Sequence, residues 1–117
     1  AGERPPLNTT LAVVATDAAL TVAQARKLAG TAHDGLARAI RPAHLMTDGD
    51  TVFTLATGER PGPAGRTPIE AALAFNVLLA AGADVLTRAV VRGVLAADGV
   101  ETPGGVFPAY RDLYGDR

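Results

Sequence analysis

The sequence contains no cysteine and no tryptophan, and only one lysine among its 117 residues. Without cysteine the chain can form neither a disulfide scaffold nor a cysteine zinc site, and it has no cysteine nucleophile. Its two histidines, His33 and His44, are eleven residues apart, which is not the spacing of two metal ligands on one helix. We therefore expect neither a metal ion nor another cofactor.

Charge and hydropathy exclude further classes. The formal net charge is −1 and the basic residues form no run, so neither nucleic acid nor an anionic membrane is an expected partner. The longest apolar stretch, residues 69–83, is interrupted by polar residues and glycine, and it is shorter than the roughly 20 residues of a membrane span. Residues 1–8 lack the apolar core of a signal peptide. These features predict a soluble cytoplasmic protein with no membrane contact.

The first half of the chain predicts a strand followed by a helix. Residues 11–15, flanked by threonines, are apolar without alternation, which is typical of a strand buried on both faces. Residues 17–20 are expected to be the loop that follows it. Thr21 and Gln24 have the spacing of a capping box, and apolar residues then recur at three and four positions. This pattern predicts an amphipathic helix over 21–41 that ends before Pro42.

The second half repeats this order. Residues 51–56 predict a strand, and residues 58–67, rich in glycine and proline, predict a loop. Thr67 can cap the next helix with Pro68 in the first turn, and we expect that helix over 68–97. Its first half is apolar nearly all round, which indicates burial between layers. The tail, residues 100–117, is expected to be irregular.

The order of elements predicts an α/β fold that is incomplete by itself. Two strands are too few for an independently stable sheet, which usually needs three or more. The first strand and the second helix nevertheless have the composition of fully buried elements. The chain therefore reads as part of a larger fold, or as a subunit tightly associated with another polypeptide.

Three side chains are candidates for chemistry. Asp48 and Asp50, two residues apart in extended chain, project to the same side and could perform acid–base work; the alternative is a solvated turn. Thr9 could act as an N-terminal nucleophile with its own amine as base, which requires cleavage of the Asn8–Thr9 bond; the alternative is an ordinary threonine at the edge of a strand. His33 is expected at the edge of the core and His44 in a loop.

The segment from Asn8 to Ala18 resembles the self-cleavage junction of the DmpA-type aminopeptidases and nylon-oligomer hydrolases, which are N-terminal-nucleophile-like hydrolases. The likeness continues through residues 25–29, 32–44 and 48–53 and the alanine-rich second helix, and so covers most of residues 8–97. Enzymes of this family are made as one precursor that splits into an α chain and a smaller β chain. The nylon-oligomer branch uses threonine as nucleophile, as Thr9 would be here.

The resemblance implies a fold, a reaction and partners. The fold would be a four-layer α/β/β/α sandwich completed by a separate α chain. Residues 1–8 would be a remnant of the segment before the cleavage site, and residues 9–117 would be the β-subunit-like part. Asn8–Thr9 would be the autocleavage site, Thr9 the nucleophile, and Asp48 and Asp50 the acidic pair beside it.

By the same resemblance, αβ units would form a homo-oligomer. The substrates would be small peptides or linear amides such as 6-aminohexanoate oligomers, while an oxyanion-hole asparagine and an active-site lysine would lie on the α chain. Two alternatives remain open at this stage. One is an acyl transferase resembling ornithine acetyltransferase, which has a similar threonine junction. The other is a family member that has lost activity and serves as an interaction module.

Overall fold

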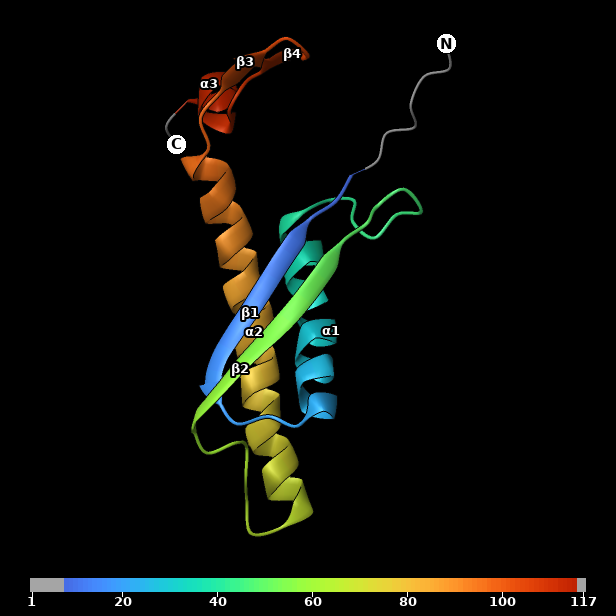
Figure 1. The fold of residues 1–117 in the computed structure, drawn as a ribbon, viewed down its shortest axis with the longest axis vertical. Helices are drawn as coiled ribbons and strands as arrows, with labels where there is room; N and C mark the ends of the chain where they lie inside the picture. The colour runs from blue at the N-terminus through green and yellow to red at the C-terminus, as the bar shows by residue number, and fades with distance from the viewer. Residues whose placement is uncertain (1–7, 116–117) are drawn as a thin grey trace.

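The computed structural model describes residues 8–115 of the chain, so the expectations for residues 1–7 and 116–117 lie outside the described residues. The elements follow in the order β1, α1, β2, α2, β3, β4 and α3 (Figure 1). Their bounds are β1 Leu11–Ala18, α1 Val22–Ala39, β2 Thr51–Arg60, α2 Pro68–Ala96, β3 Val100–Thr102, β4 Gly105–Phe107 and α3 Tyr110–Tyr114. This is the small mixed α/β arrangement that the sequence predicts.

The main sheet consists of β1 and β2, and both long helices lie on one of its faces (Figure 1). The two strands run parallel, with Leu11 opposite Thr51 and Leu55 opposite Ala15. A parallel pair needs a crossover connection, which α1 provides. α1 packs against α2 and β2, and the core between the layers contains Val14, Leu28 and Leu36 among its buried side chains.

Both long helices begin at caps that the sequence predicts. The Thr21 hydroxyl accepts a hydrogen bond from the Gln24 N–H at 3.1 Å, and the Gln24 side chain accepts one from the Thr21 N–H at 2.9 Å. The Thr67 hydroxyl accepts a bond from the Glu70 N–H at 3.2 Å, and Pro68 stands in the first turn of α2. Each cap satisfies backbone donors that have no partner inside the helix.

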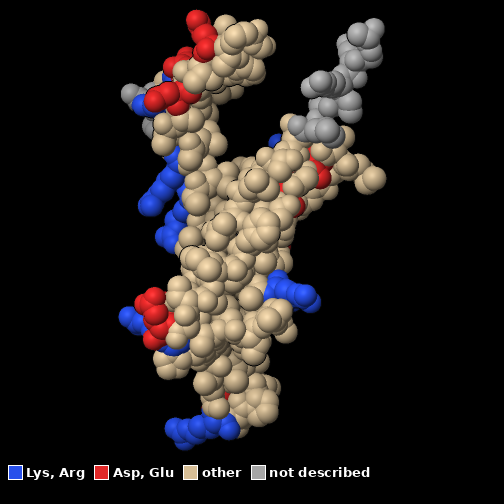
Figure 2. All heavy atoms as spheres, in the orientation of Figure 1, with Lys and Arg blue, Asp and Glu red and all other residues tan. Residues whose placement is uncertain are grey.

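Within the described residues, the chain covers only one face of β1, the strand whose composition predicts burial on both faces. Val14 is buried on the face toward the helices, whereas Leu11 is 71% and Val13 is 64% exposed on the other face. Phe53 and Leu55 of β2 are exposed in the same way. Figure 2, which views this outer face, shows charged side chains mainly at its margins. One apolar face of the strand therefore packs in the core, and its other apolar face is exposed to solvent.

Helix α2 is likewise covered on one side. Leu79, Ala83 and Leu86 are buried, while Ile69 and Val77 are about 70% exposed. By length and composition alone α2 could cross a membrane, although a core helix passes the same test. The expected apolar character is present, and within the described residues α2 packs against α1, with smaller contacts to β1 and α3.

The ends of both long strands and the structure of the tail differ from the sequence-based expectations. β1 continues to Ala18 through the expected loop 17–20, and β2 continues to Arg60 into the expected loop 58–67, because Ala18 pairs with Arg60 beyond an irregularity in the register. The tail is not irregular: β3 and β4 form an antiparallel hairpin, and α3 follows.

The chain is elongated. Its principal extents are 59 × 37 × 23 Å and its radius of gyration is 18.0 Å, whereas a compact domain of this length has a radius of about 13 Å. In Figure 1, α2 continues past the end of the sheet and carries the hairpin and α3 at its far end. This shape keeps much apolar surface in contact with solvent.

Candidate active site

The Asn8–Thr9 junction lies beside the Asp48–Asp50 segment. Asn8 and Asp48 form a parallel β-bridge just before the regular pairing of β1 with β2 begins. The Asn8 carbonyl accepts a hydrogen bond from the Gly49 N–H at 2.8 Å, and the Thr10 carbonyl accepts one from the Thr51 N–H at 3.0 Å. The parallel ladder therefore extends across the junction and brings together two segments forty residues apart.

Asp50 is the more enclosed of the two acidic residues. Its side chain is 10% exposed. One carboxylate oxygen, Oδ1, accepts a hydrogen bond from the Thr10 N–H at 3.0 Å. The other, Oδ2, lies 3.3 Å from Nδ1 of His44. Asp50 is thus fixed against the residue that directly follows Thr9.

Asp48 builds the turn that leads into β2. Its Oδ2 accepts a hydrogen bond from the Leu45 N–H at 3.0 Å, and its own N–H donates to the Leu45 carbonyl at 3.0 Å. These reciprocal bonds close a turn over residues 45–48 and so fix the backbone direction at Gly49, the residue after the turn. The solvated-turn interpretation thus describes part of what Asp48 does, but the turn also forms one side of the junction.

Gly49 faces the Thr9 hydroxyl. A Cβ atom at position 49 would stand 2.8 Å from Thr9 Oγ1 and 3.8 Å from Thr9 Cβ. The Thr9 side chain therefore lies directly over the glycine between the two aspartates. Together, the structure brings the four predicted residues, Asn8, Thr9, Asp48 and Asp50, to one end of the sheet.

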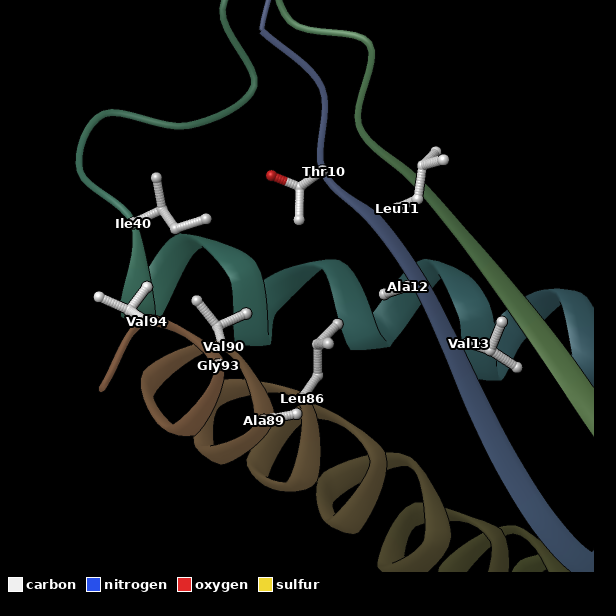
Figure 3. Close-up of a pocket in the computed structure, with 10 residues that line it drawn as sticks. All are labelled: Thr10, Leu11, Ala12, Val13, Ile40, Leu86, Ala89, Val90, Gly93 and Val94. Atoms are coloured by element: carbon white, nitrogen blue, oxygen red, sulfur yellow. The ribbon is translucent and has the colours of Figure 1, made fainter. Parts of the chain in front are cut away.

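An apolar groove adjoins the junction (Figure 3). It has a volume of about 430 Å³ and lies between the start of β1, the end of α1 and the second half of α2. Thr10 supplies the polar side chain among the residues that line it; the others are Leu11, Ala12, Val13, Ile40, Leu86, Ala89, Val90, Gly93 and Val94. The site is therefore open on a side that is mostly hydrocarbon.

His44 is a residue whose contact with the site the sequence analysis missed. It lies in a loop, as expected, but it has a positive φ of 61°. Its Nδ1 faces Asp50, its Nε2 is 3.4 Å from the His33 carbonyl, and its ring meets the His33 ring edge-on at 5.1 Å. In the sequence, only the position of His44 a few residues before Asp48 indicates that it could lie near the site. No group of three metal-binding side chains is found among residues 8–115.

Comparison with known proteins matches the chain to a family of peptidases. The model of peptidase family S58 matches residues 2–107. The chain is 50% identical over 114 residues to proteins named as uncharacterised aminopeptidases in Mycobacterium tuberculosis and Mycobacterium bovis, in alignments that cover 93% of this chain and 32% of each relative. A protein of the same description in Mycobacterium leprae is 48% identical over 109 residues, covering 87% of this chain and 30% of its own length.

The chain belongs to peptidase family S58, the DmpA aminopeptidase family. The resemblance seen in the junction and the Asp48–Asp50 segment is thereby confirmed at the level of the family. The chain spans about a third of the length of the curated relatives it matches.

Proposed function

We propose that this chain is the nucleophile-bearing part of a self-processing amide hydrolase that cleaves its own precursor at Asn8–Thr9. The observation that carries the proposal is the parallel ladder that holds this peptide bond against Asp48–Asp50, in a chain of a peptidase family. The family match favours a hydrolase over the acyl transferase alternative.

The proposed self-cleavage is an N-to-O acyl shift followed by hydrolysis. Thr9 Oγ1 attacks the Asn8 carbonyl carbon, and the C–N bond breaks as the hydroxyl proton passes to the Thr9 nitrogen. Water then hydrolyses the resulting ester, which releases the Asn8 carboxylate and frees both the hydroxyl and the amine of Thr9. An N-terminal threonine carries its own base, so the freed amine can then activate the hydroxyl against an amide substrate.

Asp48 and Asp50 would act on the charge of that new amine. A nearby carboxylate would stabilise the ammonium that forms when this amine takes the proton of the Thr9 hydroxyl, and would orient it. Asp50 has the stronger case, because Thr10 and His44 fix both of its oxygens beside the junction. Asp48 contributes through the turn that positions Gly49.

The uncovered surface of the chain supports assembly with a second chain from the same precursor. The outer face of the sheet and one side of α2 expose large apolar residues, among them Leu11, Phe53 and Val77. Burying such surface contributes roughly 25 cal/mol per Å². The proposed partner is the α chain, which would complete a four-layer α/β/β/α sandwich and supply the remaining catalytic groups, and αβ units would then form an oligomer in the cytoplasm.

The proposed substrates are short peptides with a free amino terminus and linear amides such as 6-aminohexanoate oligomers. The names of the mycobacterial relatives support the first class, and the threonine at position 9 supports the second through the family resemblance. The experiment is an assay of the full-length purified protein with both classes, beside its Thr9→Ala variant and an Asp34→Asn control on the exposed side of α1.

The hydrolase proposal predicts amine release from at least one of these substrates by the wild type and the control, and none by Thr9→Ala. Acetyl transfer to ornithine without amide hydrolysis would favour the acyl transferase instead. A folded protein with neither activity would favour the interaction module.

A further inference from the structure

The backbone N–H of Gly49 points at the scissile carbonyl group. It donates a hydrogen bond of 2.8 Å to the carbonyl oxygen of Asn8, which is the oxygen that would take negative charge if Thr9 attacked. Donors that stabilise such an oxyanion lie 2.7–3.1 Å from it. In the uncleaved chain the Gly49 nitrogen already lies 2.8 Å from the carbonyl oxygen from which that oxyanion would form.

Because Gly49 has no side chain, the Thr9 hydroxyl can occupy the space beside it. A Cβ atom there would approach Thr9 Oγ1 to 2.8 Å, which is closer than a carbon side-chain atom normally comes. Positive φ values occur at Gly58, Gly105 and Gly115 among the described glycines, but not at Gly49. The backbone conformation at position 49 therefore does not require glycine, but a side chain there would displace the Thr9 hydroxyl from this position.

Hydrogen bonds on both sides hold the donor in position. The reciprocal bonds between Asp48 and Leu45 fix the turn before it. After it, the Thr51 hydroxyl donates to the Gly49 carbonyl at 3.2 Å, and the Thr51 N–H donates to the Thr10 carbonyl. A donor fixed in this way needs no reorganisation when charge develops, which is the property that makes an oxyanion hole effective.

We infer that the Gly49 N–H is an oxyanion donor for cleavage of the Asn8–Thr9 bond. The inference rests on the proposed self-cleavage. As the bond between Thr9 Oγ1 and the Asn8 carbonyl carbon forms, the carbonyl electron pair moves onto the oxygen that Gly49 holds. When the pair returns, the C–N bond breaks and the Thr9 nitrogen takes the proton. This chain thus provides one donor of its own, whatever donors the rest of the precursor adds.

The test removes the N–H and keeps the shape of the residue. In the full-length precursor, made by semisynthesis, glycolic acid replaces Gly49 so that an ester oxygen takes the place of the N–H. The matched control makes the same replacement at Gly104, whose N–H donates to the Thr102 hydroxyl in the distant β3–β4 turn. The unfolded precursors are diluted from denaturant, and cleavage is followed by intact mass.

We expect the Gly49 ester to cleave about 100-fold more slowly than the wild type, the usual effect of losing one oxyanion donor, and the Gly104 ester to cleave within twofold of it. If the Gly49 ester cleaves at the wild-type rate while Thr9→Ala stays whole, the inference is overturned and the proposed function stands. If the wild-type precursor folds and stays whole, both are overturned.

A second measurement tests the inference in case the Gly49 ester variant does not fold. In the folded Thr9→Ala precursor, which keeps Gly49, hydrogen exchange of the Gly49 amide is followed by NMR. Exchange at least 100-fold slower than that of an unstructured amide supports the donor. Exchange at the unstructured rate overturns it.

Discussion

At the scale of single residues, Asp50 is the most constrained polar side chain beside the junction. A carboxylate that is 10% exposed loses most of its water and needs other partners to replace that solvation. The Thr10 N–H and His44 supply them. Both partners hold the charge of Asp50 next to the backbone of the residue that follows Thr9.

Replacing Asp50 with asparagine keeps the size of the side chain and an oxygen for the Thr10 N–H, but removes the charge. A hydrogen bond to a charged group contributes about 1.5–3 kcal/mol, so we expect self-cleavage of the full-length precursor to slow by about 10- to 100-fold. The time course of intact mass measures this, with Asp34→Asn as the control of equal charge change. A rate equal to that of the control would remove Asp50 from the mechanism.

His44 is expected to act as a positioning residue for Asp50. Asparagine places an amide nitrogen near the position of the histidine Nδ1, and it tolerates the left-handed backbone at φ 61°. We therefore expect His44→Asn to cleave within a fewfold of the wild type, and His44→Ala to cleave about tenfold more slowly. Equal rates for the two variants, measured with similar thermal stability, would show that the contact with Asp50 has no role.

At the scale of elements, glycines set the distance between α1 and α2. A Cβ atom at Gly35 would collide with the backbone carbonyl of Ala83 and lie 3.0 Å from Leu86 Cβ, whereas one at Gly30 would meet nothing within 4 Å. The Thr87 hydroxyl also donates to the Gly35 carbonyl at 3.1 Å across the same contact. Close packing of the helices therefore depends on Gly35 and not on Gly30.

This difference predicts opposite effects of the same substitution. Overpacking a tight contact costs about 1–3 kcal/mol, so Gly35→Ala should lower the free energy of unfolding of the assembled protein by that amount. Gly30→Ala should raise it by up to about 1 kcal/mol, since alanine is the better helix former. Urea unfolding of the two variants measures both changes. A loss of equal size at both positions would contradict the packing described here.

The sequence predicts the end of a helix or strand where neighbouring residues encode it, and misses it where contacts between distant residues decide it. The helix starts are encoded by Thr21 with Gln24 and by Thr67 with Pro68, and both are found where expected. The strand ends depend on pairing between residues far apart, as between Ala18 and Arg60, and the local pattern predicts them too early. The strands of the tail hairpin have three residues each, which is too short for a periodic pattern.

The same difference between local sequence and long-range contacts applies to the candidate site. The family resemblance predicts Thr9, Asp48 and Asp50 as site residues, and the parallel ladder explains how segments forty residues apart meet. The contact of His44 with Asp50 depends on one left-handed residue in a loop, and the hydrogen bond from Gly49 depends on register. Neither leaves a periodic signal in the sequence.

At the scale of the whole molecule, the chain has the dimensions of a part rather than of a compact domain. Its radius of gyration exceeds the compact value by several ångströms, and Leu11, Val13 and Val77 are each more than 60% exposed. Exposed apolar surface of this extent marks an interaction site or a tendency to aggregate.

We therefore expect residues 9–117, expressed alone, to bind an apolar fluorescent dye, to self-associate and to hydrolyse no amide. Coexpression with the preceding part of the full-length polypeptide should abolish dye binding and yield a single complex on size-exclusion chromatography. A monomeric isolated chain that binds no dye would contradict the assembly proposed here.

Cleavage at Asn8–Thr9 is the central claim, and intact-mass spectrometry of the full-length precursor tests it most directly. We predict that the wild type yields two chains, the smaller beginning at Thr9, and that Thr9→Ala remains a single chain. A folded wild-type protein that stays whole, or one that splits at another bond, would contradict the account.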